Sequence, residues 1–138
     1  MPFVLDASVS AVWALSDESH PLAERILDRW GDATGDRETA LVPVVWWFEV
    51  RNILVVNERR KRLTPAESNA FLKVLASFPI QADEDRDEKA MLGYCRKYQL
   101  SFYDASYLDV AIRNHLPLAT LDKALRTAAE AAGISLLV

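Results

Sequence analysis

The segment Phe3-Val-Leu-Asp6-Ala-Ser8 opens the chain with a short apolar run that ends in an acid and, two residues later, a hydroxyl residue. Three apolar residues without polar alternation predict a strand that is buried on both faces of a sheet. Residues 8–15 follow after Asp6 and Ala7, are mostly apolar, and predict a buried helix. A buried strand that leads straight into a helix is typical of parallel α/β sheets.

The alternation of short strands and helices continues to the end of the chain. We predict further strands at residues 40–42, 78–80, 116–120 and 134–138, and helices at residues 21–30, 44–60, 65–77, 83–98, 103–114 and 123–132. The start of the helix at 65–77 carries the residues of a capping box with proline at the first helical position. The pattern predicts one three-layer α/β/α domain over residues 1–138, with a central parallel sheet of four to five strands.

Length and composition exclude several classes of protein. The chain has 138 residues, of which 51% are hydrophobic and 26% charged, and this suits a globular domain that builds one core without disulfides. Its single cysteine, Cys95, cannot form an internal disulfide. No uncharged run approaches the roughly 20 apolar residues that span a bilayer, and the N-terminus lacks the basic start of a signal peptide. We therefore expect a cytoplasmic protein with no membrane association.

Four acidic residues fall at the ends of predicted strands or on apolar helix faces. Asp6 ends the first strand, and Asp122 follows the strand at 116–120 by two residues. Glu49 and Asp104 lie on apolar faces of the helices at 44–60 and 103–114. Ligands of parallel sheets bind beyond the carboxyl ends of the strands, where the strand order reverses. We expect the four carboxylates to converge at this edge.

Three of these acids also have a purely structural interpretation. Asp6 and Asp122 are placed to cap the helices that follow them, and Asp104 could complete a capping box with Ser101. Glu49 has no such role, and an ionised carboxylate in an apolar face needs a partner. Carboxylates that converge repel by about 4 kcal/mol per close pair at an effective dielectric of about 20. A bound divalent cation removes this penalty, and an all-oxygen ligand set predicts Mg²⁺ or Mn²⁺ rather than zinc.

A carboxylate-bound Mg²⁺ holds a phosphate and activates a water for in-line attack on phosphorus, which predicts phosphodiester hydrolysis. Ser8 and Thr120 each lie two residues from one of the acids, so they are candidates to orient a carboxylate, a water or a phosphate. Helix capping is the alternative role for both hydroxyls. Asp109 differs from the four acids, because Arg113 lies four residues further on and could pair with it at the surface.

Four segments of the chain match a known family. They are Val4-Leu-Asp6-Ala-Ser8, Glu49-Val-Arg-Asn-Ile-Leu54, Tyr103-Asp-Ala-Ser-Tyr-Leu108 and Leu118-Ala-Thr-Leu-Asp122. In this order they resemble the PIN-domain ribonucleases, and among these the VapC-like toxins of type II toxin–antitoxin systems. The resemblance implies Mg²⁺- or Mn²⁺-dependent endonucleolytic cleavage of RNA. It also implies a homodimer, and inhibition by a small cognate antitoxin in a toxin–antitoxin hetero-oligomer.

The resemblance also gives the four acids their expected roles. Asp6 and Asp104 would be the principal metal ligands, Asp122 a ligand directly or through water, and Glu49 the residue that orients or deprotonates the attacking water. Some relatives carry a further acid shortly after the fourth, whereas Lys123 follows Asp122 in this chain. We therefore expect one tightly bound ion, with a second one recruited by RNA.

Two features of the helix at 44–60 point to partners. It is apolar almost all round, so one side is either buried between layers or contacts a second subunit or the antitoxin. Residues 51–62 carry a net charge of +4 and the rest of the chain −8, which sum to the total of −4. Most of this positive charge lies in four consecutive residues, Arg59, Arg60, Lys61 and Arg62. They are either a solvated helix terminus or a contact for RNA or antitoxin.

Functions from other classes compete with this interpretation. A PIN-like domain could keep the fold and serve as a non-catalytic RNA-binding or protein-interaction module, although the intact acids argue against it. A phosphatase of the haloacid dehalogenase type carries a second acid where Ser8 stands in this chain. A response-regulator receiver fits poorly as well, because it needs paired acids near the first strand.

Overall fold

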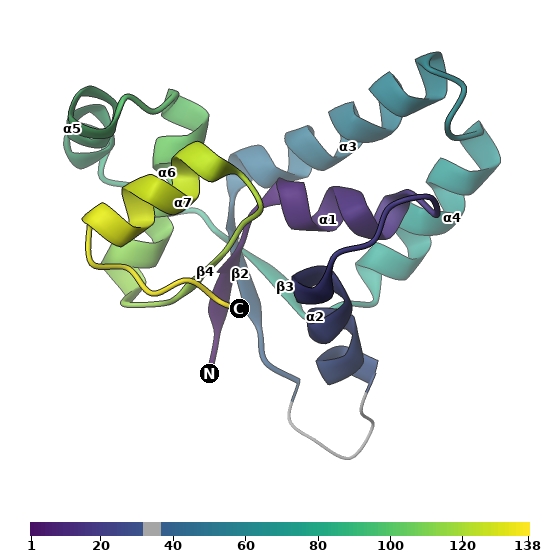
Figure 1. The fold of residues 1–138 in the computed structure, drawn as a ribbon, viewed down its shortest axis with the longest axis horizontal. Coiled ribbons are helices and arrows are strands. Elements are labelled where there is room, and N and C mark those ends of the chain that lie inside the picture. Colours follow the sequence, from purple (N-terminus) through teal and green to yellow (C-terminus); the bar gives the residue numbers. More distant parts are fainter. Residues whose placement is uncertain (32–36) are drawn as a thin grey trace.

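A parallel sheet forms the centre of the protein (Figure 1). The computed structural model describes residues 1–31 and 37–138. Within these ranges the strands are β1 (Phe3–Leu5), β2 (Ala40–Pro43), β3 (Ile80–Asp83) and β4 (Leu118–Ala119). Their order across the sheet is β3-β2-β1-β4, and all neighbours are parallel. The chain therefore moves outward from β1 to β3 and then returns to the other side of β1, so the strand order reverses between β1 and β4.

Helices cover both faces of the sheet. They are α1 (Ala7–Ala14), α2 (Pro21–Gly31), α3 (Val44–Arg59), α4 (Pro65–Ala76), α5 (Glu88–Tyr98), α6 (Phe102–Asn114) and α7 (Lys123–Ala131). Figure 1 shows α5, α6 and α7 on one side of the sheet and α1 to α4 on the other. This arrangement confirms the predicted three-layer α/β/α fold. None of the described helices is long and apolar enough to cross a membrane.

The core lies where β1 meets α6. All three residues of β1 are buried, and Val4 and Leu5 have no exposed surface. On α6, Tyr107 and Leu108 are equally inaccessible to solvent. A strand with helices on both faces has no solvent side, which is why β1 shows no polar alternation. This packing fixes the carboxyl end of β1 against the N-terminal half of α6.

Four predicted boundaries are wrong, and one of them is the strand predicted at 116–120, which spans only Leu118–Ala119. The strand predicted at 78–80 runs from Ile80 to Asp83, where it pairs with the whole of β2. The helix predicted from residue 83 begins only at Glu88, because Asp87 is its N-cap and accepts a hydrogen bond from the amide of Ala90. The strand predicted at 134–138 is a single bridge between Leu118 and Leu136. It cannot extend, since β4 has only two residues.

Two helix termini carry local sequence signals, and the first of them, the capping box, was predicted. The capping box at the start of α4 is complete, with Thr64 and Glu67 bonded to each other's backbone amides. Gly133 adopts a φ of 77° just after α7, a conformation that glycine enters without steric cost. These local signals lie within a few residues of each other, so the sequence was sufficient to predict them.

Candidate functional site

Asp6 is the buried centre of the candidate site. It follows β1 directly and is only 4% exposed. Although it occupies the N-cap position of α1, its side chain caps no backbone amide. Its Oδ2 atom instead accepts hydrogen bonds from the hydroxyl groups of Ser8 and Thr120, both at 2.6 Å. The capping interpretation of Asp6 is therefore wrong, and two hydroxyls set the orientation of its carboxylate.

The same two hydroxyls join the ends of β1 and β4. The amide of Leu121 donates to Ser8 Oγ at 2.9 Å, and the amide of Asp122 donates to Thr120 Oγ1 at 3.0 Å. Leu5 lies opposite Ala119 in the sheet, so the next residues along each strand, Asp6 and Thr120, are neighbours. The parallel register therefore brings Asp6 and Asp122 to one edge.

Asp122 and Asp104 both lie at the start of a helix, Asp122 at a cap and Asp104 in a first turn. Asp122 is the N-cap of α7, and its Oδ1 accepts a hydrogen bond from the amide of Leu125 at 2.9 Å. At the start of α6, Ser101 caps the amide of Asp104 at 3.1 Å. The carboxylate of Asp104 itself accepts no hydrogen bond from any described residue. Capping thus accounts for one carboxylate oxygen of Asp122 and leaves the carboxylate of Asp104 without a partner.

Glu49 reaches the site from α3. Its Oε1 atom accepts a hydrogen bond of 2.6 Å from the hydroxyl of Tyr107, which lies on α6 and is fully buried. The sequence analysis assigned no role to Tyr107, which lies three residues after Asp104 on the same helix. The spacing of three residues on one helix was the signal that could have identified it.

The four carboxylates lie close enough together for their charges to raise the pKa values of three of them, Asp6, Glu49 and Asp104. Burial, and then the charges of Asp122, Asp6 and Glu49, raise the pKa of Asp104 from 3.8 to about 6. Burial also raises the pKa of Glu49, where the bond from Tyr107 opposes the effect and the charges of Asp6 and Asp122 add to it. The pKa of Asp6 is raised by burial and by Asp122, against the hydroxyl bonds. No basic side chain of the described residues contributes to these three shifts, so the potential here is strongly negative.

This cluster suits a hard divalent cation in charge and donor type. Carboxylate and hydroxyl oxygens supply every side-chain donor, which is the set that Mg²⁺ or Mn²⁺ prefers. Within residues 1–31 and 37–138, no three acidic, histidine or cysteine side chains stand close enough together to form a ready-made metal site. Magnesium usually keeps several waters and uses one or two carboxylates, so such spacing fits an ion held partly through water.

The basic cluster at the end of α3 does not join this site. Arg62 forms ion pairs with Asp17 at 3.0 Å and Glu18 at 3.1 Å. Arg59, Arg60 and Lys61 are exposed. The side chain of Arg62 is thus held by two ion pairs within the chain, while the other three basic side chains are exposed to solvent.

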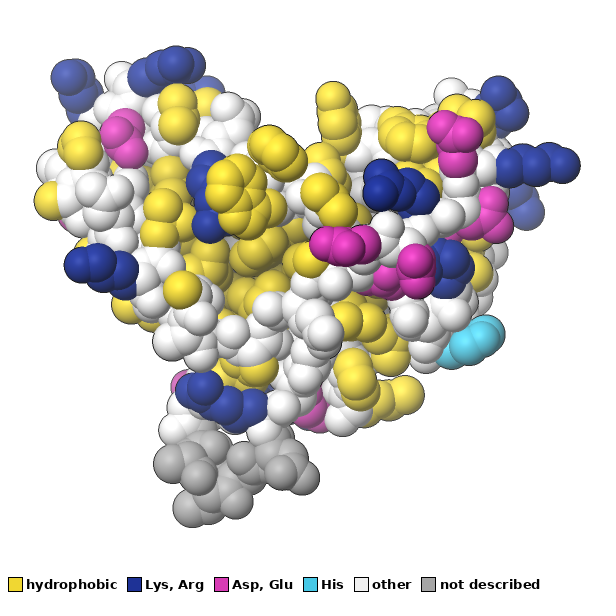
Figure 2. Space-filling model, turned by 180° about the vertical axis from the view of Figure 1, so that it is seen from behind, with side chains coloured by type: hydrophobic (Ala, Val, Ile, Leu, Met, Phe, Trp, Pro, Cys, Tyr) yellow, Lys and Arg dark blue, Asp and Glu magenta, His cyan; other side chains and the backbone are white. Residues whose placement is uncertain are grey.

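The outer face of α3 is apolar and exposed. Trp46, Val50 and Leu54 point into the core, whereas Trp47 and Phe48 are 53% and 62% exposed. Figure 2 shows hydrophobic side chains gathered in the middle of one face of the molecule. The predicted burial of one side of the helix is therefore confirmed, and the predicted contact of the other side with a second subunit or the antitoxin stays a prediction.

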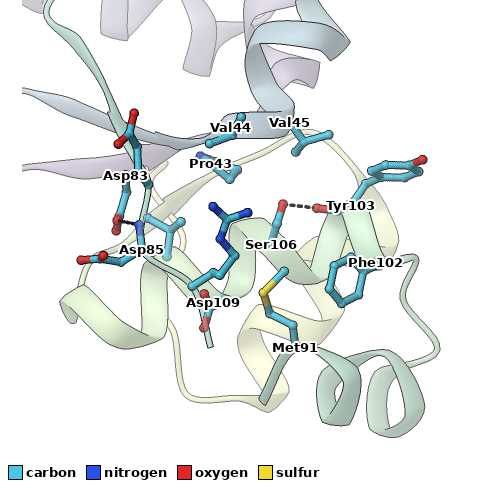
Figure 3. Close-up of a pocket in the computed structure, with 13 residues that line it drawn as sticks. Pro43, Val44, Val45, Asp83, Asp85, Met91, Phe102, Tyr103, Ser106 and Asp109 are labelled. Carbon is cyan, nitrogen blue, oxygen red and sulfur yellow. Dashed lines mark hydrogen bonds between the residues drawn. The ribbon is translucent and has the colours of Figure 1, made fainter. Parts of the chain in front are cut away.

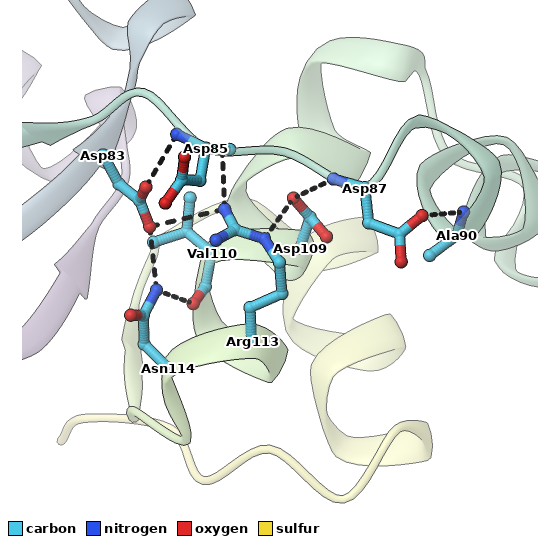
Figure 4. Close-up of polar contacts among 8 residues, drawn as sticks. All are labelled: Asp83, Asp85, Asp87, Ala90, Asp109, Val110, Arg113 and Asn114. Carbon is cyan, nitrogen blue, oxygen red and sulfur yellow. Dashed lines mark hydrogen bonds and ion pairs between the residues drawn. The ribbon is translucent and has the colours of Figure 1, made fainter.

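Asp109 lies outside the acidic cluster, on the far side of α6. Its Oδ2 atom pairs with Arg113 Nε at 2.9 Å, as the i, i+4 spacing predicted. Its position at the surface was predicted wrongly, because Asp109 is only 1% exposed. Figure 4 shows this pair covered by the connection between β3 and α5, where Arg113 also contacts Asp83 and the carbonyl of Asp85.

Comparison with known proteins places the chain in a family. The PIN domain family matches residues 3–131, so the chain belongs to the PIN domain family. A search of curated proteins gives no match.

Solved structures share the fold. The crystal structure of PAE2754 from Pyrobaculum aerophilum is 26% identical, has a TM-score of 0.70, and the match covers 93% of this chain and 84% of that one. VapC20 from Mycobacterium tuberculosis, described as a toxin that cleaves the sarcin–ricin loop, is 14% identical with a TM-score of 0.65, over 91% of this chain and 94% of that one. A toxin–antitoxin complex from Klebsiella pneumoniae is 16% identical with a TM-score of 0.56, over 87% and 86%.

Proposed function

We propose that this protein is a Mg²⁺- or Mn²⁺-dependent endoribonuclease that hydrolyses RNA phosphodiester bonds at the acidic cluster. The observation that carries the proposal is the convergence of four carboxylates, whose charges help to raise the pKa values of Asp6, Glu49 and Asp104 with no cation among the described residues to offset them. Partly buried carboxylates that repel one another destabilise the fold unless a cation binds to them. PIN domains are in general nucleases, and a divalent cation bound by carboxylates supports attack of water on phosphorus.

Each residue of the cluster has a defined task in this proposal. Asp6 and Asp104 would hold the ion, and Asp122 would contribute directly or through water. The bound ion would supply a water of lowered pKa and neutralise charge on the phosphate. Glu49, held by Tyr107, would orient the attacking water or accept its proton. Ser8 and Thr120 hold the Asp6 carboxylate in place, and their hydrogen bonds lower its pKa against the effect of burial.

We further propose that the protein is the toxin of a type II toxin–antitoxin pair. Its fold is shared with VapC20, a toxin, and with the chain from the Klebsiella pneumoniae complex of toxin and antitoxin. The partners would be an RNA substrate in the cytoplasm, a small antitoxin and a second copy of this chain. The exposed apolar residues Trp47 and Phe48 on α3 support a protein interface, because contiguous exposed apolar surface often marks an interaction site.

Cleavage of total cellular RNA by the purified protein tests the nuclease. Wild type with Mn²⁺ is compared with wild type in EDTA and with the Asp104→Asn variant. The control variant is Asp28→Asn, which makes the same substitution at an exposed position of α2. We expect discrete products from wild type and Asp28→Asn, and none from the EDTA or Asp104→Asn samples. Asp104→Asn should remain folded, because its half-buried side chain supports no hydrogen bond.

The competing function is a non-catalytic RNA-binding or protein-interaction module. It is favoured by the absence, among the described residues, of three metal-binding side chains already in one group. Intact RNA in every sample, together with no binding of Mn²⁺ in a calorimetric titration, would establish that function instead. Cleavage that persists in Asp104→Asn would reject the proposed site.

A further inference from the structure

A cavity lies between the start of α3, the connection from β3 to α5, and α6. Its volume is about 200 Å³ (Figure 3). Most of its wall is apolar and comes from Pro43, Val44, Val45, Met91, Phe102 and Val110. None of the four acids of the nuclease site proposed above is among its lining residues.

The floor of this cavity carries a buried carboxylate that is only half satisfied. Asp109 lines the cavity and is 1% exposed. Its Oδ2 atom accepts from Arg113 Nε at 2.9 Å and from the amide of Asp87 at 3.3 Å. Its Oδ1 atom is buried and has no hydrogen-bond partner among the described residues. Figure 4 shows both bonds on one oxygen, with the other oxygen left over. An unpaired oxygen of this kind is costly, and an entering donor would remove the cost.

Acidic groups dominate the polar part of the wall. Asp83, Glu84, Asp85 and Asp109 supply four carboxylates against the single guanidinium of Arg86. Arg113, just outside the lining, is shared between two of these carboxylates, at 3.3 Å from Asp83 and 2.9 Å from Asp109. Arg86 is exposed and forms no ion pair with any described acid. The cavity therefore attracts a cation that carries several hydrogen-bond donors.

Apolar surface continues beyond the mouth of the cavity. Val44, Phe102 and Tyr103 line the cavity and are 44%, 44% and 63% exposed. Phe48 lies one helical turn after Val44 on the same face of α3 and is 62% exposed. An occupant that covers this surface is longer than a small amine, so the surface fits a peptide segment.

We infer that this cavity binds an arginine side chain from a partner polypeptide, with apolar residues of the same segment packed on Val44, Phe48 and Tyr103. The guanidinium enters the cavity and donates to Asp109 Oδ1, and its planar donor fork suits a carboxylate that already uses its other oxygen. The inference does not depend on metal binding or RNA cleavage, so its failure and the failure of the nuclease proposal can be told apart.

Peptide titrations of the ¹⁵N-labelled full chain in EDTA test this inference. The probe is acetyl-Leu-Arg-Phe-amide, and its neutral isostere carries citrulline in place of arginine. We expect the arginine peptide to shift the amide signals of Met91 and Val110, and to bind about fivefold or more tightly than the citrulline peptide. Equal affinities, or shifts centred on Asp6 and Thr120, would overturn the inference.

Two variants and their matched controls locate the contact. Asp109→Asn should bring the arginine peptide to the affinity of the citrulline peptide, whereas Asp122→Asn, which removes the same charge from the acidic cluster, should not. Because Asp109→Asn also weakens the pair with Arg113, Ser106→Leu provides a second variant that fills the cavity and leaves that pair intact. It should abolish binding of both peptides, while Asn69→Leu on exposed α4 should not. Binding that survives Ser106→Leu would reject the cavity.

Discussion

Thr120 donates a hydrogen bond to Asp6 Oδ2 at 2.6 Å, although 114 positions separate the two residues in the chain. The contact exists because β1 and β4 are parallel neighbours, with Leu5 opposite Ala119. It lies at the point where the strand order reverses, which is where parallel α/β sheets bind their ligands.

Replacement of Thr120 by valine should weaken metal binding without unfolding the protein. Valine keeps the shape but removes the hydroxyl whose bond favours the ionised form of Asp6, so the pKa of Asp6 should rise further. We expect Mn²⁺ to bind about tenfold more weakly in a calorimetric titration. Thr127→Val, on the exposed side of α7, is the matched control. Unchanged Mn²⁺ affinity in Thr120→Val would show that the hydroxyl does not support a metal ligand.

The metal-free protein should become more stable when Asp104 is replaced by asparagine. The pKa of Asp104 is raised in the fold from 3.8 to about 6, so the folded state binds this proton more tightly than the unfolded state. Its stabilising contribution is complete below about pH 4 and is lost as the pH rises through about 6. At pH 8 in EDTA, the variant should exceed wild type by about 1 kcal/mol, after allowance for solvent screening of a half-buried group.

Urea unfolding at pH 8 and at pH 4.5 measures this difference. The gain of Asp104→Asn should shrink at the lower pH, where wild-type Asp104 is protonated. The comparison of the two proteins removes the contribution of surface ion pairs such as Arg62–Asp17, which both share. A gain that is equal at both values of pH would show that charge repulsion is not its cause.

Tyr107→Phe should shift the pH dependence of RNA cleavage. Phenylalanine fills the same buried space, but the hydroxyl that bonds Glu49 at 2.6 Å is lost. This bond lowers the pKa of Glu49 against burial, so its loss should raise that pKa and move the acidic limb of the pH–rate profile upward. Activity should fall most at low pH and recover in part near pH 8. Tyr98→Phe is the control, and an equal loss at all pH values would contradict the expected effect.

Trp47→Ser should weaken self-association and leave the isolated subunit folded. The side chain of Trp47 is 53% exposed and contacts Phe48 and Arg51 on the same helix. We expect sedimentation velocity to show a shift from dimer to monomer at micromolar concentration. Val74→Ser removes an apolar side chain of similar exposure, 52%, from α4 and should not change the assembly. Persistence of the dimer in Trp47→Ser would exclude this face as the interface.

Charge reversal of Arg59 and Arg60 should weaken RNA binding in a salt-dependent way. Both side chains are exposed, whereas Arg62 is committed to Asp17 and Glu18 and is better left unchanged. If the two cations contact phosphates, the slope of log affinity against log salt should fall by about 2 in magnitude. The control is the double variant Lys89→Glu, Arg96→Glu, which makes the same change of charge at two exposed positions of α5. An unchanged slope for the α3 variant would leave Arg59 and Arg60 as a solvated helix end.

Local signals predicted most of the fold. The apolar run of β1, the capping box of α4 and the glycine after α7 each depend on residues within one turn of each other. The predicted boundaries failed where pairing between distant segments decides the outcome. Ile80 to Asp83 is a strand because β2 lies beside it, and Leu136 pairs only once because β4 is short.

The sequence by itself determined the alternation of strands and helices and pointed to the four acids, because periodicity and residue type report local preference and burial. Only the tertiary structure decided that Asp6 bonds hydroxyls rather than a helix end, and that Tyr107 holds Glu49. It also decided that Asp109 is buried, with one oxygen that has no partner among the described residues. Each of these depends on contacts between segments that are far apart in the sequence. Such contacts are set by the packing of α6 and β4 against β1, which no local pattern encodes.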